Sequence, residues 1–416
     1  MNRSSLFYKI IKGLYKRLPT GLQQRLQRIQ YNLLSRRRYN KAVKLNPIPN
    51  WVREAQSSPL LIIIPCGFEF DPLVNQRPIN AAKYFASKGY FVLFTAWQWE
   101  PDEKLALGCT EVYPGIQQIP LFDLLAWANH LSNVPDGIRC YLATIPSPSL
   151  VDLASLLRGL EFRIVYDIMD DWEEFSKVGQ APWFSQSHES SLVISADHIS
   201  AVSPPLAEKF KHLRSDIHII GNGYNAKTLG LENKNIAAPC ILENMTIGYF
   251  GHLTDSWFDW DLLLKIAATL PDTCFEIIGY GEPDWVVRSV HDFPNIKIIG
   301  KVPPEKLNQH VRKWHIGFIP FKPGNLACAV DPIKIYEYIY FGLPTIVTGI
   351  PHLSRYPDTF FADNIEDVIK KIRGLTYHKI DIKATEIFLE STTWNSRFQS
   401  IESLLKSESL FSYYEK

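Results

Sequence analysis

Two side chains near the end of the chain, Lys334 and Glu337, have the types and the spacing that can bind a nucleoside diphosphate. Residues three positions apart lie on one face of an α-helix, so a helix over residues 331–342 would place this cation and this carboxylate side by side. The cation suits a phosphate, and the carboxylate, about 5 Å further along the axis, suits the hydroxyl groups of a ribose. For this segment taken alone, a Lys–Glu pair on a solvated helix surface is the alternative.

The residues around this pair predict a short helix whose N-terminus is open to a ligand. Asp331 is a common N-cap residue, and Pro332 fits the first helical position. Gly342 favours the left-handed conformation that ends many helices, and Pro344 prevents the helix from continuing. The free N–H groups and the positive dipole end of such an N-terminus attract phosphate, so we expect the diphosphate there.

A second polar cluster, YDIMDDWEEF at residues 166–175, contains the end of an apolar run that predicts a strand. Functional loops of α/β domains lie at such strand ends, so Asp170 or Asp171 can assist an acceptor hydroxyl group as a catalytic residue. Capping of the following helix is the alternative for the same two carboxylates. Gly67 and Phe68 in an earlier loop, and Arg77 beyond it, are candidates for acceptor binding.

The elements that must position these residues are predicted by short apolar runs that alternate with helical segments. Residues 51–225 indicate one doubly wound, Rossmann-like sheet, and residues 240–375 indicate a second. A helix within residues 390–416 has no strand partner and is expected to pack back on the first domain. Two such α/β domains that face one another leave a cleft at the carboxyl ends of both sheets, where ligands bind.

Composition limits the class of protein. A chain of 416 residues with 46% hydrophobic residues exceeds one ordinary core, so two domains are expected. The six cysteines form no C-x-x-C pair, which favours reduced thiols and a cytoplasmic location. No apolar stretch reaches the roughly 20 residues that span a bilayer, and we see no signal peptide.

Residues 1–50 form a basic arm that differs from the rest of the chain. Thirteen of the 44 Lys and Arg residues precede Glu54, the first acidic residue. Apolar residues recur every four positions from Leu6 to Leu18, which predicts an amphipathic helix. We expect residues 1–44 to lie on an anionic membrane surface, with packing on the acidic body of the protein as the alternative. No nucleic acid is expected as a partner, because the basic residues are confined to the arm and no aromatic stacking module accompanies them.

The segment DPIKIYEYIYFGLPTIV at residues 331–347 resembles the P-x-K-x-x-E-Y…G-x-P-V-V element of family 4-like glycosyltransferases, the glycosyl transferases of group 1. Further segments resemble other motifs of this family in the family's order: NQRPINAAKYFASKGYFV at 75–92, IIGNGYN at 219–225, GYFGHLTDSWFDWDLL at 248–263, IIGYGEP at 277–283 and GKVPPEKL at 300–307. The resemblance implies the GT-B fold, that is, two α/β Rossmann-like domains facing a cleft.

The resemblance also implies an activity, the transfer of a hexose from a nucleotide-sugar donor in the C-terminal domain to an acceptor held by the N-terminal one. Neither a metal nor a further cofactor is then expected. The carried-over donor-binding positions are Gly251, His252, Gly281, Lys301, Lys334 and Glu337. Together with the arm, the resemblance favours a lipid-linked or polysaccharide acceptor in cell-surface glycan synthesis, on the inner face of the membrane.

Three positions depart from the family pattern. Ala329 replaces the glutamate that often stands eight positions before Glu337, which leaves the donor sugar and retention of configuration open. His252 replaces a basic residue that assists the phosphates, for which Lys301 or Lys322 can compensate. Met169 replaces the His or Arg that often precedes the aspartate at Asp170.

Other functions fit parts of the same sequence. A GT-B-fold nucleotide-sugar epimerase and a catalytically silent subunit that binds sugar nucleotides are the main alternatives. A metal-binding D-x-D motif of a single-domain enzyme at Asp259–Asp261 is disfavoured, because these residues precede a predicted helix and suit its capping. The 11 histidines form no zinc-binding pattern.

Overall fold

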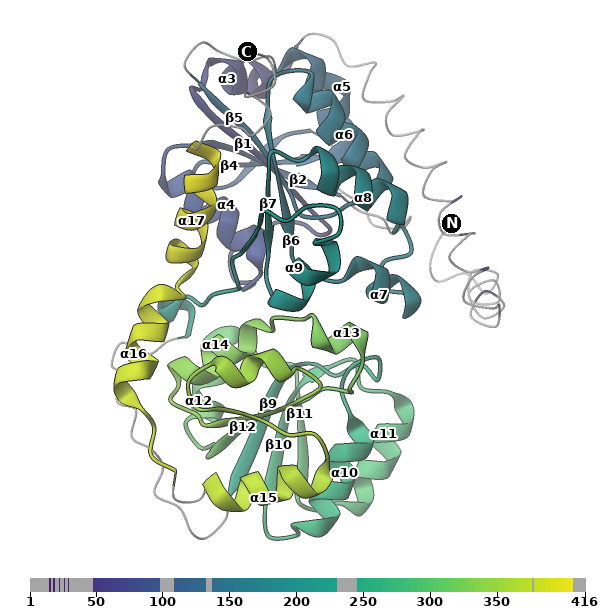
Figure 1. Ribbon diagram of the computed structural model, residues 1–416, viewed down its shortest axis with the longest axis vertical. Coiled ribbons are helices and arrows are strands. Elements are labelled where there is room, and N and C mark those ends of the chain that lie inside the picture. Colours follow the sequence, from purple (N-terminus) through teal and green to yellow (C-terminus); the bar gives the residue numbers. More distant parts are fainter. Residues whose placement is uncertain are drawn as a thin grey trace.

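The computed structural model describes residues 48–97, 108–131, 137–229, 245–375 and 378–406, with the single positions Tyr15, Leu18, Leu22, Leu26 and Ile29. The chain forms two α/β domains stacked along the long axis of the molecule (Figure 1). Each contains a sheet that is parallel or nearly so, which confirms the fold class expected from the sequence. Most of the expected arm, residues 1–50, lies outside the described residues.

The N-terminal domain is built on an eight-stranded sheet of order β3-β4-β2-β1-β5-β6-β7-β8. Its neighbouring strands are parallel except for β3, which is antiparallel to β4. The strands are β1 Leu60–Cys66, β2 Phe91–Ala96, β3 Thr110–Tyr113, β4 Ile116–Pro120, β5 Ile138–Ala143, β6 Arg163–Ile168, β7 His198–Ala201 and β8 Ile217–Ile219.

Helices cover both faces of this sheet, which is why its central strands are continuous apolar runs. In β1, Leu61 and Ile63 pack into one core cluster, whereas Ile62 and Ile64 pack into another on the opposite face. The helices are α3 Asn50–Ser57, α4 Arg77–Ser87, α5 Leu121–Trp127, α6 Pro148–Arg158, α7 Trp172–Lys177, α8 Gln186–Ser195 and α9 Pro204–Phe210.

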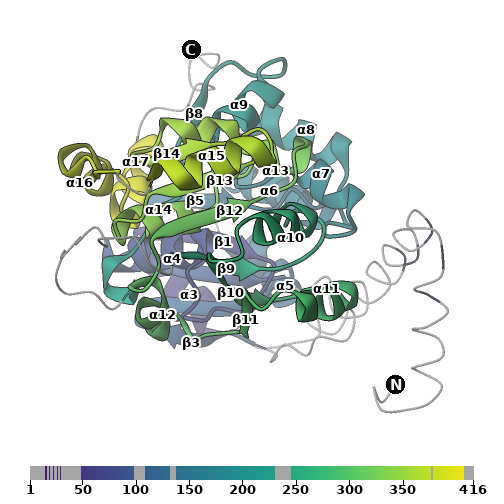
Figure 2. The same ribbon diagram turned by 90° about the horizontal axis from the view of Figure 1, so that it is seen from below.

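The C-terminal domain has a six-stranded parallel sheet of order β11-β10-β9-β12-β13-β14. Figure 2 views the molecule from below, with this domain in front. Its strands are β9 Thr246–His252, β10 Cys274–Tyr280, β11 Ile296–Gly300, β12 Ile316–Pro320, β13 Thr345–Thr348 and β14 Thr359–Phe361. Its helices are α10 Trp260–Thr269, α11 Asp284–Ser289, α12 Pro304–Val311, α13 Asn325–Cys328, α14 Ile333–Tyr340 and α15 Ile365–Leu375. The described residues also include four short 3₁₀ helices: η1 Ala128–His130, η2 Ala226–Leu229, η3 Val290–Asp292 and η4 Pro351–Arg355.

Two last helices, α16 Ile382–Ser391 and α17 Trp394–Lys406, carry the chain back to the N-terminal domain (Figure 1). The apolar face of α17, including Trp394 and Phe398, is buried in the core cluster under α4. Where the chain crosses between domains, Trp394 N donates to Tyr224 O at 3.1 Å, so the outgoing and returning segments pair. This pairing joins the two segments that connect the domains.

The described residues bear on two features considered in the sequence, membrane-spanning helices and the state of the cysteines. No helix among them is both long and apolar enough to cross a membrane. Five cysteines are free thiols: Cys66, Cys109, Cys140, Cys274 and Cys328.

Candidate functional site

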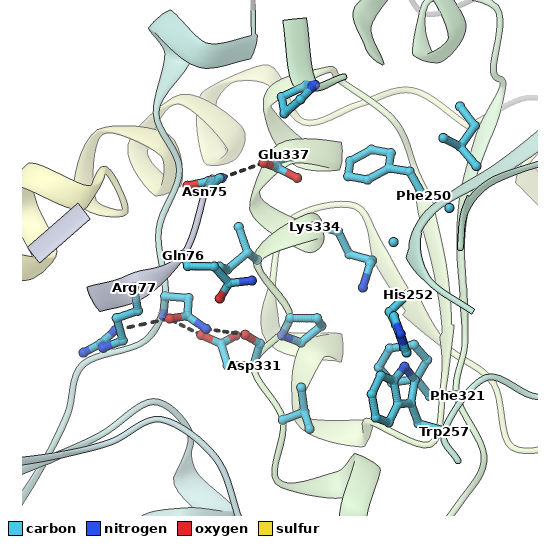
Figure 3. A pocket seen from close by; sticks show the side chains of 18 of the residues that line it. Asn75, Gln76, Arg77, Phe250, His252, Trp257, Phe321, Asp331, Lys334 and Glu337 are labelled. Carbon is cyan, nitrogen blue, oxygen red and sulfur yellow. Dashed lines mark hydrogen bonds between the residues drawn. The ribbon is translucent and has the colours of Figure 1, made fainter. Parts of the chain in front are cut away.

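A cleft of about 550 Å³ lies between the two domains and is lined by both. The C-terminal domain contributes the carboxyl ends of β9 and β10, the segment after β11, and the start of α14. The N-terminal domain contributes the loop before α4 and the loop after β6. Figure 3 shows Lys334 and Glu337 on one helix facing this space, with Asn75 and Gln76 opposite.

Helix α14 presents Lys334 and Glu337 to the cleft because its other faces are apolar. Ile335, Tyr338 and Ile339 are buried in the core of the C-terminal domain, which fixes the rotation of the helix. The expected C-terminal stop is present, since Gly342 has φ +68° just after the last turn. The spacing of three residues therefore places the cation and the carboxylate on the face of the helix that lines the cleft, as the sequence predicts.

The start of α14 differs from the expectation. Pro332 is the N-cap, and Asp331 does not cap the helix. Instead, Asp331 Oδ2 accepts from Asn222 N at 2.6 Å and Tyr336 Oη at 2.7 Å, and its Oδ1 accepts from Tyr356 Oη at 3.1 Å. This buried carboxylate joins the C-terminal domain to the segment that links the domains. The N–H groups at the start of α14 are consequently left without a side-chain cap.

Lys334 is enclosed by aromatic rings and a glycine. Its Nζ lies 5.0 Å from the centroid of Tyr249 and 5.2 Å from that of Phe321. Gly251 has φ +145°, a conformation that favours glycine, and a Cβ there would lie 3.2 Å from the same Nζ, so the backbone of β9 runs close to the ammonium group. Burial lowers the pKa of Lys334 to about 8, and the nearby carboxylate of Glu337 opposes this shift. A cation so enclosed gains strongly from an anionic ligand.

Glu337 is held by a side chain of the opposite domain. Asn75 Nδ2 donates to Glu337 Oε1 at 2.7 Å (Figure 3). Asn75 is itself fixed, because its Oδ1 accepts from Trp394 Nε1 at 2.8 Å and from Asn80 Nδ2 at 3.0 Å. Burial raises the pKa of Glu337 to about 7, whereas Asn75 and Lys334 lower it. Sequence reasoning missed Asn75, although it begins one of the quoted motifs.

Of the other predicted donor-binding residues, some line the cleft and others lie outside it. Gly251, His252 and Lys301 line the cleft, and the Lys301 ammonium lies 5.3 Å from the ring centroid of Tyr280. Gly281 does not line the cleft, but a Cβ there would come within 2.8 Å of His252 Nε2. Burial and the charge of Lys334 lower the pKa of His252. Lys322 pairs with Asp255 at 2.8 Å outside the lining.

Arg77 reaches the cleft wall, yet its guanidinium group is engaged elsewhere. Its Nε and Nη2 donate to the two carboxylate oxygens of Asp167 at 2.7 and 2.9 Å. Its remaining donors reach the carbonyls of Ile220 at 3.0 Å and Gly221 at 2.8 Å. Because every nitrogen of this buried group has a partner, Arg77 holds β6 to the linking segment rather than presenting its charge to an acceptor.

The two aspartates after β6 have different surroundings. Asp171 Oδ1 accepts from Glu174 N at 3.1 Å, which caps α7, and it pairs with Lys209 at 2.6 Å. Asp170 lines the cleft, and no hydrogen bond to its carboxylate is found within the described ranges. Burial, reinforced by the charge of Asp171, raises the pKa of Asp170 to about 7. A carboxylate with that pKa, facing a cleft, can accept a proton near neutral pH.

Gly67 and Phe68 lie outside the lining of the cleft, and Phe68 is 42% exposed. Ala329 also lies outside it: the residue is buried against the core of the N-terminal domain, and its carbonyl accepts from Ser203 Oγ at 2.6 Å. Residues that sequence reasoning did not select, such as Gln76 and Phe175, line the cleft instead. Their positions in the lining depend on how the two domains contact each other, and no sequence motif predicts that contact.

No group of three or more His, Cys, Asp or Glu side chains that could hold a metal ion occurs within the described residues. Asp259 accepts from Leu262 N at 2.9 Å and caps α10. The structure thus confirms the helix capping that the sequence favoured over a D-x-D motif at Asp259–Asp261.

Comparison with known proteins gives a relative and a fold. No protein-family model matches the chain. Over 274 residues it is 25% identical to TuaH of Bacillus subtilis (strain 168), a protein named as a glycosyltransferase of teichuronic acid biosynthesis. That match spans 62% of this chain and 66% of TuaH, a little under two thirds of the relative.

Solved structures share the architecture at low sequence identity. Sucrose-phosphate synthase from Thermosynechococcus elongatus is 13% identical with a TM-score of 0.61, covering 83% of this chain and 98% of its own. Anabaena Alr3699/HepE in complex with UDP-glucose is 15% identical with a TM-score of 0.56, covering 84% and 99%. These likenesses show that the two-domain fold is shared.

Proposed function

We propose that this chain, which has the GT-B fold of the group 1 glycosyltransferases, transfers a sugar from a nucleoside diphosphate sugar to an acceptor hydroxyl group. The observation that carries the proposal is the pairing of Lys334 and Glu337 on the cleft-lining face of α14, with Asp170 in the lining contributed by the other domain. The relation to TuaH and the UDP-glucose bound to HepE support the same class of reaction.

The donor occupies the C-terminal wall. Its diphosphate lies against Lys334, Gly251 and the uncapped N–H groups at the start of α14. The ribose hydroxyls donate to Glu337, and the base lies toward Tyr280 and the segment after β11. As the glycosidic bond breaks, negative charge grows on the leaving diphosphate, and the fixed ammonium group of Lys334 stabilises it.

The acceptor approaches from the N-terminal wall, where the Asp170 carboxylate can accept its proton. In this proposal the sugar is a hexose, and no metal ion takes part, because Lys334 and the backbone N–H groups supply the positive charge. The acceptor is a lipid-linked or polysaccharide chain of the cell surface, in keeping with the pathway named for TuaH. The protein acts in the cytoplasm.

Association with the inner face of the membrane is part of the proposal. Three described residues of the arm, Leu22, Leu26 and Ile29, are helical and 43%, 42% and 57% exposed. Spacings of four and three residues place them on one helix face, and the arm around them is rich in Lys and Arg. Deleting residues 1–44 should release the protein from anionic vesicles in a flotation assay, whereas retention on the vesicles would contradict membrane binding.

The test of the donor site is the binding of UDP, GDP and dTDP to the wild type and to Glu337→Ala by calorimetry. A lost hydrogen bond to a charged group should weaken binding of the matching diphosphate by roughly 1.5 to 3 kcal/mol. Glu366→Ala, an exposed glutamate in the first turn of α15, is the matched control and should bind normally. Equal affinity in all three proteins would refute the donor site.

A turnover measurement separates this function from its alternatives. A transferase should release nucleoside diphosphate from the donor slowly in water and faster with an acceptor. An epimerase should interconvert sugar nucleotides, and a silent binding subunit should do neither. Interconversion, or no diphosphate release with any donor that binds, would refute glycosyl transfer.

A further inference from the structure

Gln76 lies in the cleft wall between two residues whose side chains are bonded within the protein. The side chain before it, Asn75, donates to Glu337. The guanidinium group after it, that of Arg77, has a partner at every nitrogen. The carbonyl of Gln76 itself accepts from Asn80 N at 3.0 Å and from Asn80 Nδ2 at 2.9 Å. The backbone at Gln76 is therefore held on both sides and from below.

The side chain of Gln76, in contrast, has no hydrogen-bond partner within the described ranges. Gln76 is the N-cap residue of α4, yet its side chain does not accept from the first turn of that helix. It is exposed and lines the cleft instead. A carboxamide offers both N–H donors and an oxygen acceptor, so this wall presents an unused polar group to a ligand that fills the cleft.

The contacts of its two neighbours place Gln76 opposite Lys334. The residue before it is bonded to Glu337, one turn beyond Lys334 on α14. The residue after it donates to Asn222 Oδ1 at 3.4 Å, and Asn222 N donates to Asp331 Oδ2 at 2.6 Å, just before the start of α14. In Figure 3, Gln76 lies across the cleft from Lys334, between these two contacts.

The chemistry of this position suits a neutral amide. In the proposed function the diphosphate of the donor lies against Lys334, and thus in the space that Gln76 faces. A carboxylate in place of the amide would pair with Lys334 and compete with the diphosphate. The amide leaves Lys334 free, and its N–H group can donate to a phosphate oxygen in a charge-assisted hydrogen bond.

Two other polar groups of the lining lack partners, but neither can donate to an anion from the N-terminal wall. Asp170 only accepts hydrogen bonds when it is ionised, and its charge then repels a phosphate. The Nδ1 atom of His252 is buried without a hydrogen-bond partner in the described part of the chain, and it belongs to the C-terminal wall, at the end of β9. Gln76 therefore supplies the N-terminal wall with a donor for an anionic ligand.

We infer that Gln76 binds the donor from the N-terminal wall: its side-chain amide donates to the diphosphate opposite Lys334, so that the diphosphate bridges the two domains. The inference rests on the proposed function, which supplies the diphosphate. It adds a contact from the domain that holds the acceptor. Since Asn75 and Gln76 are consecutive, one short segment of that domain then contacts both Glu337 and the ligand.

The experiment ranks replacements of Gln76 by their affinity for a free diphosphate. Calorimetry with UDP, GDP and dTDP identifies the diphosphate that the wild type binds, and the same ligand is then titrated into three variants. Gln76→Ala should bind it roughly 10-fold more weakly, the loss expected for a hydrogen bond to a charged group. Gln76→Glu, which is nearly isosteric, should bind more weakly still, because its carboxylate repels the diphosphate and pairs with Lys334. Gln76→Lys should match or exceed the wild type, because it keeps a donor and adds a positive charge.

This ranking separates ligand binding from a structural role. All three replacements remove the amide, so a purely structural Gln76 would give three similar affinities. Gln399 is exposed on α17 outside the cleft lining, and Gln399→Ala and Gln399→Glu are the matched controls that should bind as the wild type does. Circular dichroism verifies that every variant is folded.

Different failures identify different errors. Unchanged affinity in Gln76→Ala would overturn the inference, and so would a Gln76→Glu variant that binds as tightly as Gln76→Ala. A loss seen with UDP-glucose, GDP-mannose or dTDP-glucose but not with the free diphosphate would assign Gln76 to the sugar and likewise overturn it. In these cases weaker binding by Glu337→Ala would show that the donor site stands. If no diphosphate binds to the wild type, the proposed function is wrong, and the inference with it.

Discussion

The two walls of the cleft use charged side chains in opposite ways. On the C-terminal wall, Lys334 has no carboxylate within salt-bridge distance among the described residues, and it faces open space beside Gly251. In the N-terminal domain, Arg77 in the wall and Asp171 outside the lining are both paired within the protein. Of the acidic and basic candidates there, Asp170 alone faces the cleft without a partner in the described ranges.

This difference follows from how each charge is buried. A buried ion needs a partner of opposite charge. Arg77 is paired with Asp167, and this ion pair offsets the desolvation free energy of the buried guanidinium group. Lys334 is buried among rings that solvate it weakly, and burial lowers its pKa to about 8. An unmatched buried charge indicates a ligand of opposite charge, whereas a matched one indicates structure.

The largest expected effect is on Asp170. Asp170→Asn removes the proton acceptor and should lower kcat by roughly 10²- to 10⁴-fold, while donor affinity stays nearly constant because the other wall holds the nucleotide. Steady-state kinetics and calorimetry on the same preparation measure both quantities. Full turnover in this variant would remove the N-terminal wall from the chemistry, whereas a matching loss of donor affinity would show that Asp170 contacts the donor.

Loss of Lys334 should affect both binding and turnover. Lys334→Ala removes the cation beside the diphosphate, and we expect kcat to fall by roughly 10²- to 10³-fold together with weaker donor binding. The control is Lys370→Ala, an exposed lysine of α15 outside the cleft lining, which should behave as wild type. Normal donor affinity in the Lys334 variant would contradict donor binding by Lys334 and leave the Lys–Glu pair with a structural role only.

A smaller effect is expected from Asn75, through the pKa of Glu337. Donor affinity should fall below about pH 7, where Glu337 becomes protonated, and above about pH 8, where Lys334 loses its charge. Asn75 lowers the pKa of Glu337, so Asn75→Ala should move the acid limb to higher pH and leave the alkaline limb in place. Affinity measured from pH 5 to 10 tests this, and an unmoved acid limb would separate Asn75 from the donor site.

The C-terminal wall could be predicted from the sequence because its signals are local. The pair Lys334 and Glu337, the stop at Gly342 and the close approach at Gly251 all depend on residues within one helix or one strand end. The start of the helix could not be predicted, because Asp331 bonds to Asn222, which lies 109 residues away in the sequence. That partner outcompetes the local cap.

Two contacts of the N-terminal wall could not be predicted from the sequence, because their partners are also distant in the chain. Arg77 stands 90 residues from Asp167, and Asn75 stands 262 residues from Glu337. No periodicity or motif in the sequence predicts either of these two contacts. The α/β fold itself was predicted, since alternating apolar runs and helical segments depend only on neighbours.

The smallest expected effect concerns Asp171, and it is the sharpest test of the contrast with its neighbour Asp170. Asp171→Ala removes the cap of α7 and the ion pair with Lys209, which together should lower the free energy of unfolding by about 1 to 2 kcal/mol. Asp171→Asn keeps a capping oxygen and loses only the charge, so its unfolding energy should lie between those of Asp171→Ala and the wild type. Both variants should retain turnover below their melting range, because the side chain bonds within the N-terminal domain and lies outside the cleft lining. If instead Asp171→Asn loses turnover with unchanged stability, while Asp170→Asn keeps it, the two carboxylates have exchanged roles and the loop must rearrange when the donor binds.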